Sequence, residues 1–210
     1  MYKLFLKRTI DIILSGIAII LLIPIWIFLA VAIKVDDPGP VFFRQKRIGR
    51  DKHGKIQFFM IFKYRSMKMC TPHDVPTHLL ENPEQYITKV GAFLRKTSLD
   101  ELPQIFNIFM GQMSIVGPRP ALWNQDDLYE ERAKYGANAV MPGLTGWAQI
   151  NGRDELPISY KAKLDGEYVE KMNFLFDCKC FFKTFTSVLK HEGVVEGGTG
   201  ALQKEEDVEK

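Results

Sequence analysis

Hydrophobic and polar positions divide the chain into an apolar N-terminal segment and a longer segment in which both classes are mixed. There is no charged residue from Ile12 to Ile33, and a straight helix over this stretch would be about 33 Å long. That length suffices to cross a hydrocarbon core of about 30 Å. The stretch continues into Asp36 and Asp37 rather than into a small-residue cleavage site. The pattern therefore predicts a retained membrane segment and not a signal peptide.

Two features of this segment argue against a simple crossing. Pro24 lies near its middle, where a proline lacks an amide donor, clashes with the carbonyl four residues earlier and is expected to bend the helix. Basic residues also lie on both sides, whereas a single crossing usually keeps them on one side. From the residues alone, a bent re-entrant segment and a spanning helix with a tolerated proline stay equally open. The basic residues are Lys3, Lys7, Arg8, Lys34, Arg44, Lys46, Arg47 and Arg50.

Directly after the apolar segment, β-branched and aromatic residues flank a polar stretch that contains glycine. Residues 41–47 and 56–62 have the composition of strands, and residues 49–54 between them have that of a turn. The pattern predicts a small β-hairpin. Residues 70–85 contain three prolines and are expected to form a loop.

Helical spacing of apolar residues predicts most of the remaining structure. The last predicted helix has an apolar side that either packs inside the domain or lies on the membrane. Two stretches rich in glycine and proline, 111–120 and 142–152, are expected to be irregular, and such segments in a small domain are more often functional than idle. The helices are predicted at 86–95, 99–110, 121–135, 158–172 and 174–190.

Composition excludes several functional classes. A net charge of +3 from 28 basic and 25 acidic residues is too small to predict a nucleic-acid partner. Cys70, Cys178 and Cys180 form no C-x-x-C pair and have no histidine at metal-ligand spacing, so neither a zinc site nor a disulfide framework is indicated. We expect a reduced protein that faces the cytoplasm.

The sharpest local feature is Ser-Leu-Asp-Glu-Leu-Pro-Gln at residues 98–104, where a helix is expected to begin. Ser98 and Glu101 have the spacing of a capping box, and this structural role is the commoner use of such a sequence. The position also suits attack on phosphorus, because a helix end and a nearby cation would keep Asp100 ionised as a nucleophile. Glu101 would point about 100° away and would help Asp100 to hold Mg²⁺.

Chemistry on phosphate also requires positive charge near the carboxylates. Arg95, Arg119 and Arg153 offer planar guanidinium groups that match phosphate oxygens, although each one alone is more often a surface residue. Pro120 completes a Gly-Pro-Arg-Pro sequence around Arg119. Trp147 offers a ring for stacking on a nucleobase, although packing is the usual use of tryptophan. These five residues are the candidate substrate-binding set.

Taken together, these segments resemble the small monotopic phosphoglycosyl transferases of the bacterial sugar transferase family. The resemblance runs over nearly the whole chain and includes several motifs in order. The motifs are the basic and apolar start at 7–35, Gly-Pro-Val-Phe-Phe-Arg-Gln at 39–45, Phe-Lys-Tyr-Arg-Ser-Met at 62–67, and the segments 98–104, 111–120 and 142–153.

The resemblance implies a reaction in two steps. Asp100 attacks the sugar-bearing phosphate of a UDP-sugar, releases UMP and forms a covalent phosphosugar intermediate. Polyprenyl phosphate, usually undecaprenyl phosphate, then takes over the phosphosugar. The resemblance also implies Mg²⁺ as cofactor, a re-entrant helix bent at Pro24, and a place on the cytoplasmic face of the bacterial inner membrane. Downstream glycosyltransferases of capsule, exopolysaccharide or glycoprotein assembly are further partners that it implies.

The expected fold is α+β and mainly helical. It comprises a kinked re-entrant membrane helix at 1–36, a cytoplasmic catalytic domain at 37–196 with a small β-hairpin and interfacial amphipathic helices, and a flexible tail at 197–210. Two positions depart from the family pattern. Ile23 stands where the family often has a serine whose hydroxyl satisfies a freed carbonyl. Gln112 replaces an aspartate, so no role of that carboxylate is carried over.

Two rival functions explain part of the sequence. A non-catalytic, membrane-anchored binding protein with a basic cytoplasmic surface would explain the apolar segment and its flanking lysines, but not the ordered motifs. A retaining or inverting glycosyltransferase would hold its metal through a D-x-D motif, for which Asp36-Asp37 and Asp126-Asp127 are poor substitutes. Release of UMP separates the proposed reaction from both. Galactose, N-acetylated hexosamines and rarer deoxysugars all remain open as the sugar.

Overall fold

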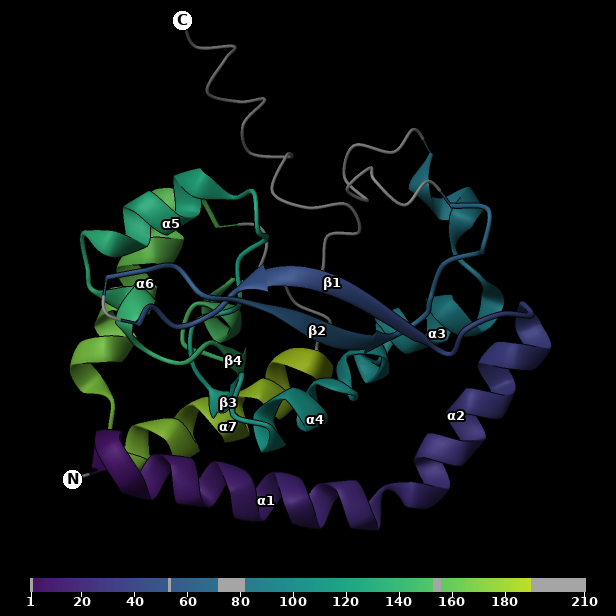
Figure 1. The fold of residues 1–210 in the computed structure, drawn as a ribbon, viewed down its shortest axis with the longest axis horizontal. Coiled ribbons are helices and arrows are strands. Elements are labelled where there is room, and N and C mark those ends of the chain that lie inside the picture. Colours follow the sequence, from purple (N-terminus) through teal and green to yellow (C-terminus); the bar gives the residue numbers. More distant parts are fainter. Residues whose placement is uncertain (1, 53, 72–81, 153–155, 190–210) are drawn as a thin grey trace, which may run out of the picture.

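The computed structural model describes residues 2–52, 54–71, 82–152 and 156–189, and these residues form a mainly helical chain with two small sheets (Figure 1), as the sequence predicts. The helices are α1 Lys7–Leu21, α2 Ile23–Asp36, α3 Lys89–Lys96, α4 Gln104–Phe109, α5 Asp126–Ala133, α6 Ile158–Lys171 and α7 Phe174–Leu189. The strands are β1 Phe42–Ile48, β2 Phe58–Tyr64, β3 Ser114–Val116 and β4 Gly143–Thr145.

The apolar N-terminal segment forms two helices, α1 and α2, which are bent by 62° relative to each other. Pro24 lies in the first turn of α2, where its missing amide removes no bond from that helix, so the predicted bend is confirmed. In Figure 1, α1 runs along the lower edge and α2 rises from its end towards α3. No single described helix is long and apolar enough to cross a membrane, and the bent pair passes that test only as a pair.

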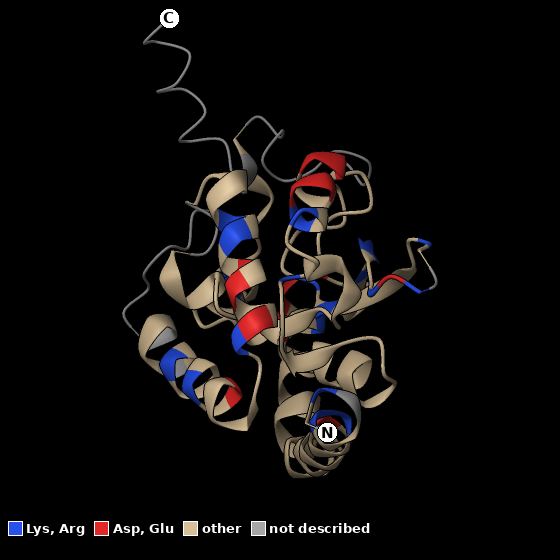
Figure 2. Cartoon of the chain, turned by 90° about the vertical axis from the view of Figure 1, so that its left-hand side faces the viewer, with Lys and Arg blue, Asp and Glu red and all other residues tan. Residues whose placement is uncertain are grey.

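Helix α1 turns its polar side towards the domain. Lys7, Asp11 and Ser15 are buried, and their spacing of four residues places them on one face. In Figure 2, the N-terminal end of α1 faces the viewer. The charged positions of this helix lie at that end, and the turns behind it are uncharged. The outer side is apolar, with Ile12, Ile13, Ile17, Ile20 and Leu21 exposed.

One carboxylate fastens the start of this segment to the C-terminal part of the chain. Asp177 in α7 accepts a hydrogen bond from Nζ of Lys7 at 2.5 Å. It also accepts hydrogen bonds from the hydroxyls of Tyr2 and Tyr168. Because Asp177 is buried, these three donors replace the water that the carboxylate loses.

Further polar contacts fix both ends of the bent pair. Asp11 accepts a hydrogen bond from the amide of Ile115 in β3 at 3.0 Å. At the other end, Asp36 accepts from the amide of Val90 at 2.7 Å in α3. Asp37 pairs with the guanidinium group of Arg65. The middle of α2 contributes Leu29 and Ile33 to an apolar cluster with Tyr64 and Leu94.

The predicted hairpin is confirmed, with strand ends shifted by one or two residues. β1 and β2 pair antiparallel, from Phe42 opposite Tyr64 to Ile48 opposite Phe58. Ile61 on the inner face packs with Ile108 of α4 and with Met113. Lys63 lies two residues from Ile61 and therefore points to the same face.

The two stretches expected to be irregular contain a short parallel sheet instead. Strands β3 and β4 pair Ser114 with Gly143 and Val116 with Thr145. A Cβ on Gly143 would lie 2.1 Å from the amide nitrogen of Gly117, so only glycine permits this approach of the two backbones. Strands of three residues are too short for a period of two to reveal them in the sequence.

The helix predicted at 99–110 is confirmed in part, whereas its capping box is wrong. Helix α4 begins only at Gln104, after a 3₁₀ turn at Leu99–Glu101. Ser98 has a positive φ of 56° and makes no capping hydrogen bond. The carboxylate of Glu101 binds two distant cations, so it does not close a box with Ser98.

The remaining helix predictions are confirmed in part. The helix expected at 86–95 begins at Lys89, where the side chain of Thr88 caps it by accepting from the amide of Gly91 at 2.9 Å. The helix expected at 121–135 is confined to α5. The two C-terminal helices lie within one residue of their predicted bounds, and the predicted tail at 197–210 lies outside the described residues.

The apolar side of helix α7 is divided between the inside of the domain and its exposed surface. Asp177 and Cys180 are buried against the domain, whereas Leu175 and Phe182 are 76% and 66% exposed. Phe176 packs against the buried cluster that contains Cys180, so the apolar side of this helix lies partly inside the domain and is partly exposed. Like α1, α7 also exposes large apolar residues on its outer side.

Candidate active site

The acidic pair lies in the 3₁₀ turn Leu99–Glu101, between α3 and α4. The turn is closed by the amide of Leu102, which donates to the carbonyl of Leu99 at 3.1 Å. Ser98, between α3 and this turn, adopts a left-handed conformation. The pair is thus presented by a tight turn and not by the first turn of an α-helix.

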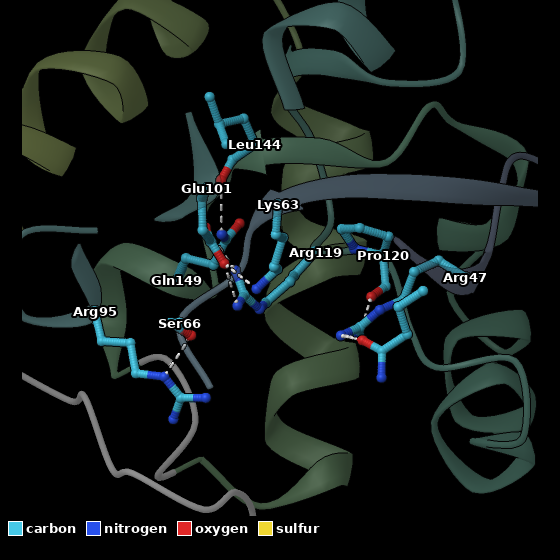
Figure 3. Close-up of polar contacts among 10 residues, drawn as sticks. Arg47, Lys63, Ser66, Arg95, Glu101, Arg119, Pro120, Leu144 and Gln149 are labelled. Atoms are coloured by element: carbon cyan, nitrogen blue, oxygen red, sulfur yellow. Dashed lines mark hydrogen bonds and ion pairs between the residues drawn. The ribbon is translucent and has the colours of Figure 1, made fainter. Parts of the chain in front are cut away.

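Glu101 is bound by two cations from different parts of the chain (Figure 3). Nζ of Lys63 and one guanidinium nitrogen of Arg119 each lie 2.8 Å from its Oε1. The side chain of Glu101 is 16% exposed. Burial raises the pKa of Glu101, but Arg119 and Lys63 outweigh burial and hold this pKa well below its ordinary value. Glu101 is therefore a permanent anion at neutral pH.

Asp100 differs sharply from its neighbour. Within the described part of the chain, no donor is hydrogen-bonded to its carboxylate. Burial raises the pKa of Asp100 above its ordinary value, with a further contribution from the charge of Glu101. Lys63, Arg95 and Arg119 oppose this rise. The sequence suggested instead that a helix end would favour the anion, and that expectation fails because α4 starts four residues later.

Two of the three predicted arginines lie around the acidic pair. Arg95 in α3 donates from Nε to the hydroxyl of Ser66 at 2.9 Å, which fixes the guanidinium group. Among the described residues, no partner binds its two terminal nitrogens. Arg119 is 36% exposed and holds Glu101 through two hydrogen bonds. Arg153 lies outside the described residues, so its assignment stays a prediction.

The backbone around Arg119 is anchored on both sides. The amide of Gly143 in β4 donates to the carbonyl of Pro118 at 2.8 Å. A guanidinium nitrogen of Arg47 in β1 donates to the carbonyl of Pro120 at 3.0 Å (Figure 3). The Gly-Pro-Arg-Pro segment thus bridges the two small sheets, and Pro120 contributes through its carbonyl oxygen.

Trp147 lies in a packed cluster. Its ring centroid is 5.0 Å from that of Phe176, and Nζ of Lys179 lies 5.2 Å from the ring. Its indole N–H donates to Glu167 at 3.2 Å. These contacts engage both the ring and its donor, as the packing interpretation expects. Stacking on a nucleobase stays a prediction.

The acidic pair provides only part of a metal site. Among the described residues there is no group of three or more His, Cys, Asp or Glu side chains able to hold a metal ion. Asp100 fits as one oxygen ligand of Mg²⁺, because no protein donor is bonded to it in the described chain. Glu101 fits only if a cation leaves it. A hard cation here would depend on substrate phosphates and water for its other ligands.

Lys63 is the site residue that the sequence analysis missed. The motif at 62–67 contains it, but no role followed from a single lysine between two aromatic residues. A signal was present, because a charged residue at a position that alternates with the inward-facing Ile61 needs a partner of opposite charge. That partner, Glu101, is 38 residues away along the chain.

The arrangement combines a carboxylate that has no hydrogen-bonded donor among the described residues with three nearby cations. A carboxylate in this state can attack an electrophilic centre, and the cations can bind an anion such as a diphosphate. Both properties are those of a site for phosphoryl transfer.

Comparison with known families supports this chemistry. The family model described as "Bacterial sugar transferase" matches residues 2–191. An Escherichia coli UDP-glucose:undecaprenyl-phosphate glucose-1-phosphate transferase is 42% identical over 186 residues, which are 85% of this chain and 39% of that protein. A Salmonella typhimurium undecaprenyl-phosphate galactose phosphotransferase is 36% identical over 203 residues, 90% of this chain and 41% of that protein.

The relatives differ in length. This chain spans about two fifths of the two enzymes just described. In contrast, the match to the exopolysaccharide production protein ExoY of Rhizobium meliloti, at 33% identity over 201 residues, covers 89% of this chain and 87% of that protein. The shared part therefore corresponds to a portion of the longer enzymes and to most of the shorter relative.

Proposed function

The chain belongs to the bacterial sugar transferase family, and on this premise we propose that it transfers a sugar 1-phosphate from a UDP-sugar to polyprenyl phosphate and releases UMP. The observation that carries the proposal is the contrast within the acidic pair. Glu101 is held by two cations, whereas Asp100 has no hydrogen-bonded donor in the described chain. Only Asp100 is then ready to react.

In the first step, a carboxylate oxygen of Asp100 attacks the phosphorus that bears the sugar. A bond forms between this oxygen and phosphorus, and the bond between phosphorus and the bridging oxygen of the diphosphate breaks. UMP leaves with the electron pair of that bond. The sugar phosphate remains on Asp100 as an acyl phosphate.

In the second step, a phosphate oxygen of the polyprenyl carrier attacks the same phosphorus. The acyl phosphate bond breaks and Asp100 returns as a carboxylate. The product is a polyprenyl diphosphate sugar. Two displacements at one phosphorus explain why the site needs a single reactive carboxylate and not a pair of equal ones.

The cations would stabilise charge during both steps. Arg119 and Lys63 share Glu101 in the absence of substrate, and a diphosphate bound nearby would compete with Glu101 for their N–H groups. Arg95 offers two terminal nitrogens from a side chain fixed by Ser66. Mg²⁺ bound by Asp100 and substrate oxygens would add a Lewis acid that withdraws electrons from phosphorus.

The bent pair would bring this site to the lipid. Its outer surface is apolar and its two ends are tied to the domain by polar contacts, so insertion of the bend without crossing fits both features. Each arm is about 20 Å long, which is too short to cross the hydrocarbon core. Entry into the bacterial inner membrane from its cytoplasmic face would place the site where both the lipid phosphate and a cytoplasmic UDP-sugar can reach it.

A product assay tests the proposal. With polyprenyl phosphate, the purified protein should release many UMP molecules per enzyme from a UDP-sugar. Without the lipid, it should release one UMP per enzyme. A screen of UDP-glucose, UDP-galactose and UDP-N-acetylhexosamines identifies the sugar. Release of UDP would indicate a glycosyltransferase, and no nucleotide release with any donor would favour the anchored binding protein.

A further inference from the structure

At the bend between α1 and α2, Ile23 stands where the family often has a serine, so no hydroxyl at this position can donate to a freed carbonyl. The bend contains another hydrogen-bond donor. Pro24 has no amide hydrogen for the carbonyl of Ile20, and the break exposes neighbouring carbonyls as well. The indole Nε1–H of Trp26 donates to the carbonyl of Ile19 at 3.1 Å. A serine at position 23 would reach this same carbonyl, because a hydroxyl bonds the carbonyl four residues earlier.

This hydrogen bond joins the two helices across the break. Ile19 belongs to α1 and Trp26 to α2, and in a straight helix the two positions would be about 10 Å apart along the axis. The bend of 62° shortens the path between them. A donor on one arm and an acceptor on the other therefore oppose straightening.

The ring of Trp26 also fixes the bend against the catalytic domain. Its centroid lies 5.3 Å from that of Phe106 in α4 and 6.0 Å from that of Tyr64 in β2. Both elements lie within the angle between α1 and α2 in Figure 1. Trp26 is half-buried, whereas Ile25 and Ile27 beside it are exposed. Tyr64 directly follows Lys63, which pairs with Glu101. The contact between Trp26 and Tyr64 therefore connects the bend to the end of β2 that lies at the acidic pair.

We propose that Trp26 is a positioning residue that replaces the missing hydroxyl at position 23 and locks the bent pair to β2 and α4. Its N–H holds the angle between the arms, and its ring fixes that angle relative to the site. The link to catalysis rests on the proposed function, because a fixed angle sets how the lipid phosphate meets Asp100. The effect on the bend does not depend on that function.

The test uses spin labels on both arms of the full chain in lipid nanodiscs. Cysteines replace Ile13 and Val31, which are 54% and 56% exposed, in a background in which Cys70 and Cys178 are serine. The parent should give one narrow distance distribution. Trp26→Phe keeps an aromatic ring but removes the donor, and it should broaden the distribution towards the roughly 27 Å of a straight helix. Adding Ile23→Ser to Trp26→Phe should narrow it again.

The same variants separate positioning from chemistry. Trp26→Phe should raise the KM for polyprenyl phosphate about fivefold, the loss expected for one hydrogen bond, and leave the single-turnover release of UMP without lipid unchanged. Trp123→Phe is the matched control, because Trp123 is 52% exposed and lies outside the bend. Trp123→Phe should change neither the KM for polyprenyl phosphate nor the single-turnover release of UMP.

Two results would overturn the proposal. One is a parent-like distance distribution for Trp26→Phe, and the other is a broad distribution that Ile23→Ser fails to narrow. Both results are distance distributions between the spin labels and do not depend on UMP release. A failure of the proposed reaction would therefore be distinguished from a failure of the proposed role of Trp26. Because phenylalanine retains most of the packing with Phe106 and Tyr64, a folded variant is expected.

Discussion

Two carboxylates in this molecule are each surrounded by donors, and they differ in what lies beside them. Asp177 accepts hydrogen bonds from Lys7, Tyr2 and Tyr168 and joins the first helix to the last. Glu101 is bound by a lysine and an arginine and joins β2 to the Gly-Pro-Arg-Pro segment. Only Glu101 has a second carboxylate next to it, and that one has no hydrogen-bonded donor among the described residues.

The difference separates fastening from reactivity. Three donors on a buried carboxylate leave it little capacity for other partners, which suits a contact that holds two distant helices. At the acidic pair, the cations neutralise Glu101 and still act on Asp100 from a distance. The same kind of contact thus stabilises the fold in one region and prepares a nucleophile in the other.

The largest expected effect comes from removing the reactive carboxylate. Asp100→Asn should lower UMP release by at least about 10³-fold, because the amide is a poor nucleophile at phosphorus. Its thermal stability should match that of the parent, since no hydrogen bond to Asp100 is lost in the described chain. Measurement of UMP and of the melting temperature checks both. UMP release at the wild-type rate by Asp100→Asn would contradict the proposal that the acidic pair is reactive and Asp177 is not.

The reverse pattern is expected at the fastening site. Asp177→Asn leaves the buried Lys7 without its counter-ion and should destabilise the protein by about 3 kcal/mol. The first half-reaction, measured per folded molecule, should be retained. Denaturant unfolding in detergent gives the stability and single-turnover UMP release gives the reactivity. Lys134→Ala, which breaks an exposed ion pair with Glu131, is the control and should have little effect.

A smaller effect should follow from changing the shape of one cation. Arg119→Lys keeps the charge but loses the second hydrogen bond to Glu101 and the planar fork for phosphate. The KM for the UDP-sugar should rise about tenfold. Arg132→Lys at the buried pair with Asp165 should lower stability and leave that KM unchanged. Equal KM values for Arg119→Lys and the parent would count against a role in donor binding.

The smallest effect is a shift in pH dependence. The nucleophile must be ionised, so activity should rise as the pH rises through the pKa of Asp100. Glu101 helps to raise this pKa, and Glu101→Gln removes that negative charge and frees two cations. The acid limb of the kcat/KM profile for the UDP-sugar should therefore move to lower pH. A limb that moves to higher pH would contradict the described electrostatics.

The parts of the fold that sequence predicted are those fixed by local chemistry. A proline in the middle of a long apolar stretch disfavours one continuous helix, and the hairpin and the last two described helices follow from short-range apolar periodicity. The strands β3 and β4 escaped prediction because close contact of Gly117 with Gly143, and not a periodic pattern, brings them together.

The candidate site was predicted as a set of residues but not as an arrangement. Asp100, Glu101, Arg95 and Arg119 were selected, yet the capping role of Ser98 failed because long-range ion pairs engage Glu101 instead. Lys63 was missed for the same reason. A pairing with a residue 38 positions away leaves no mark in the spacing of a single sequence, and only the inward-facing position of Lys63 indicated that it needs a partner.

The contact of Lys7 with Asp177 has a consequence for how the protein is made. The two residues are separated by 170 positions, and at 5 to 20 residues per second the ribosome needs roughly 10 to 30 s to synthesise the chain between them. During that interval, the apolar residues after Lys7 have emerged while the carboxylate that fastens them does not yet exist. The apolar segment is thus synthesised well before the contact that fastens its start, and we expect the nascent chain to need a lipid surface or a chaperone until α7 has been made.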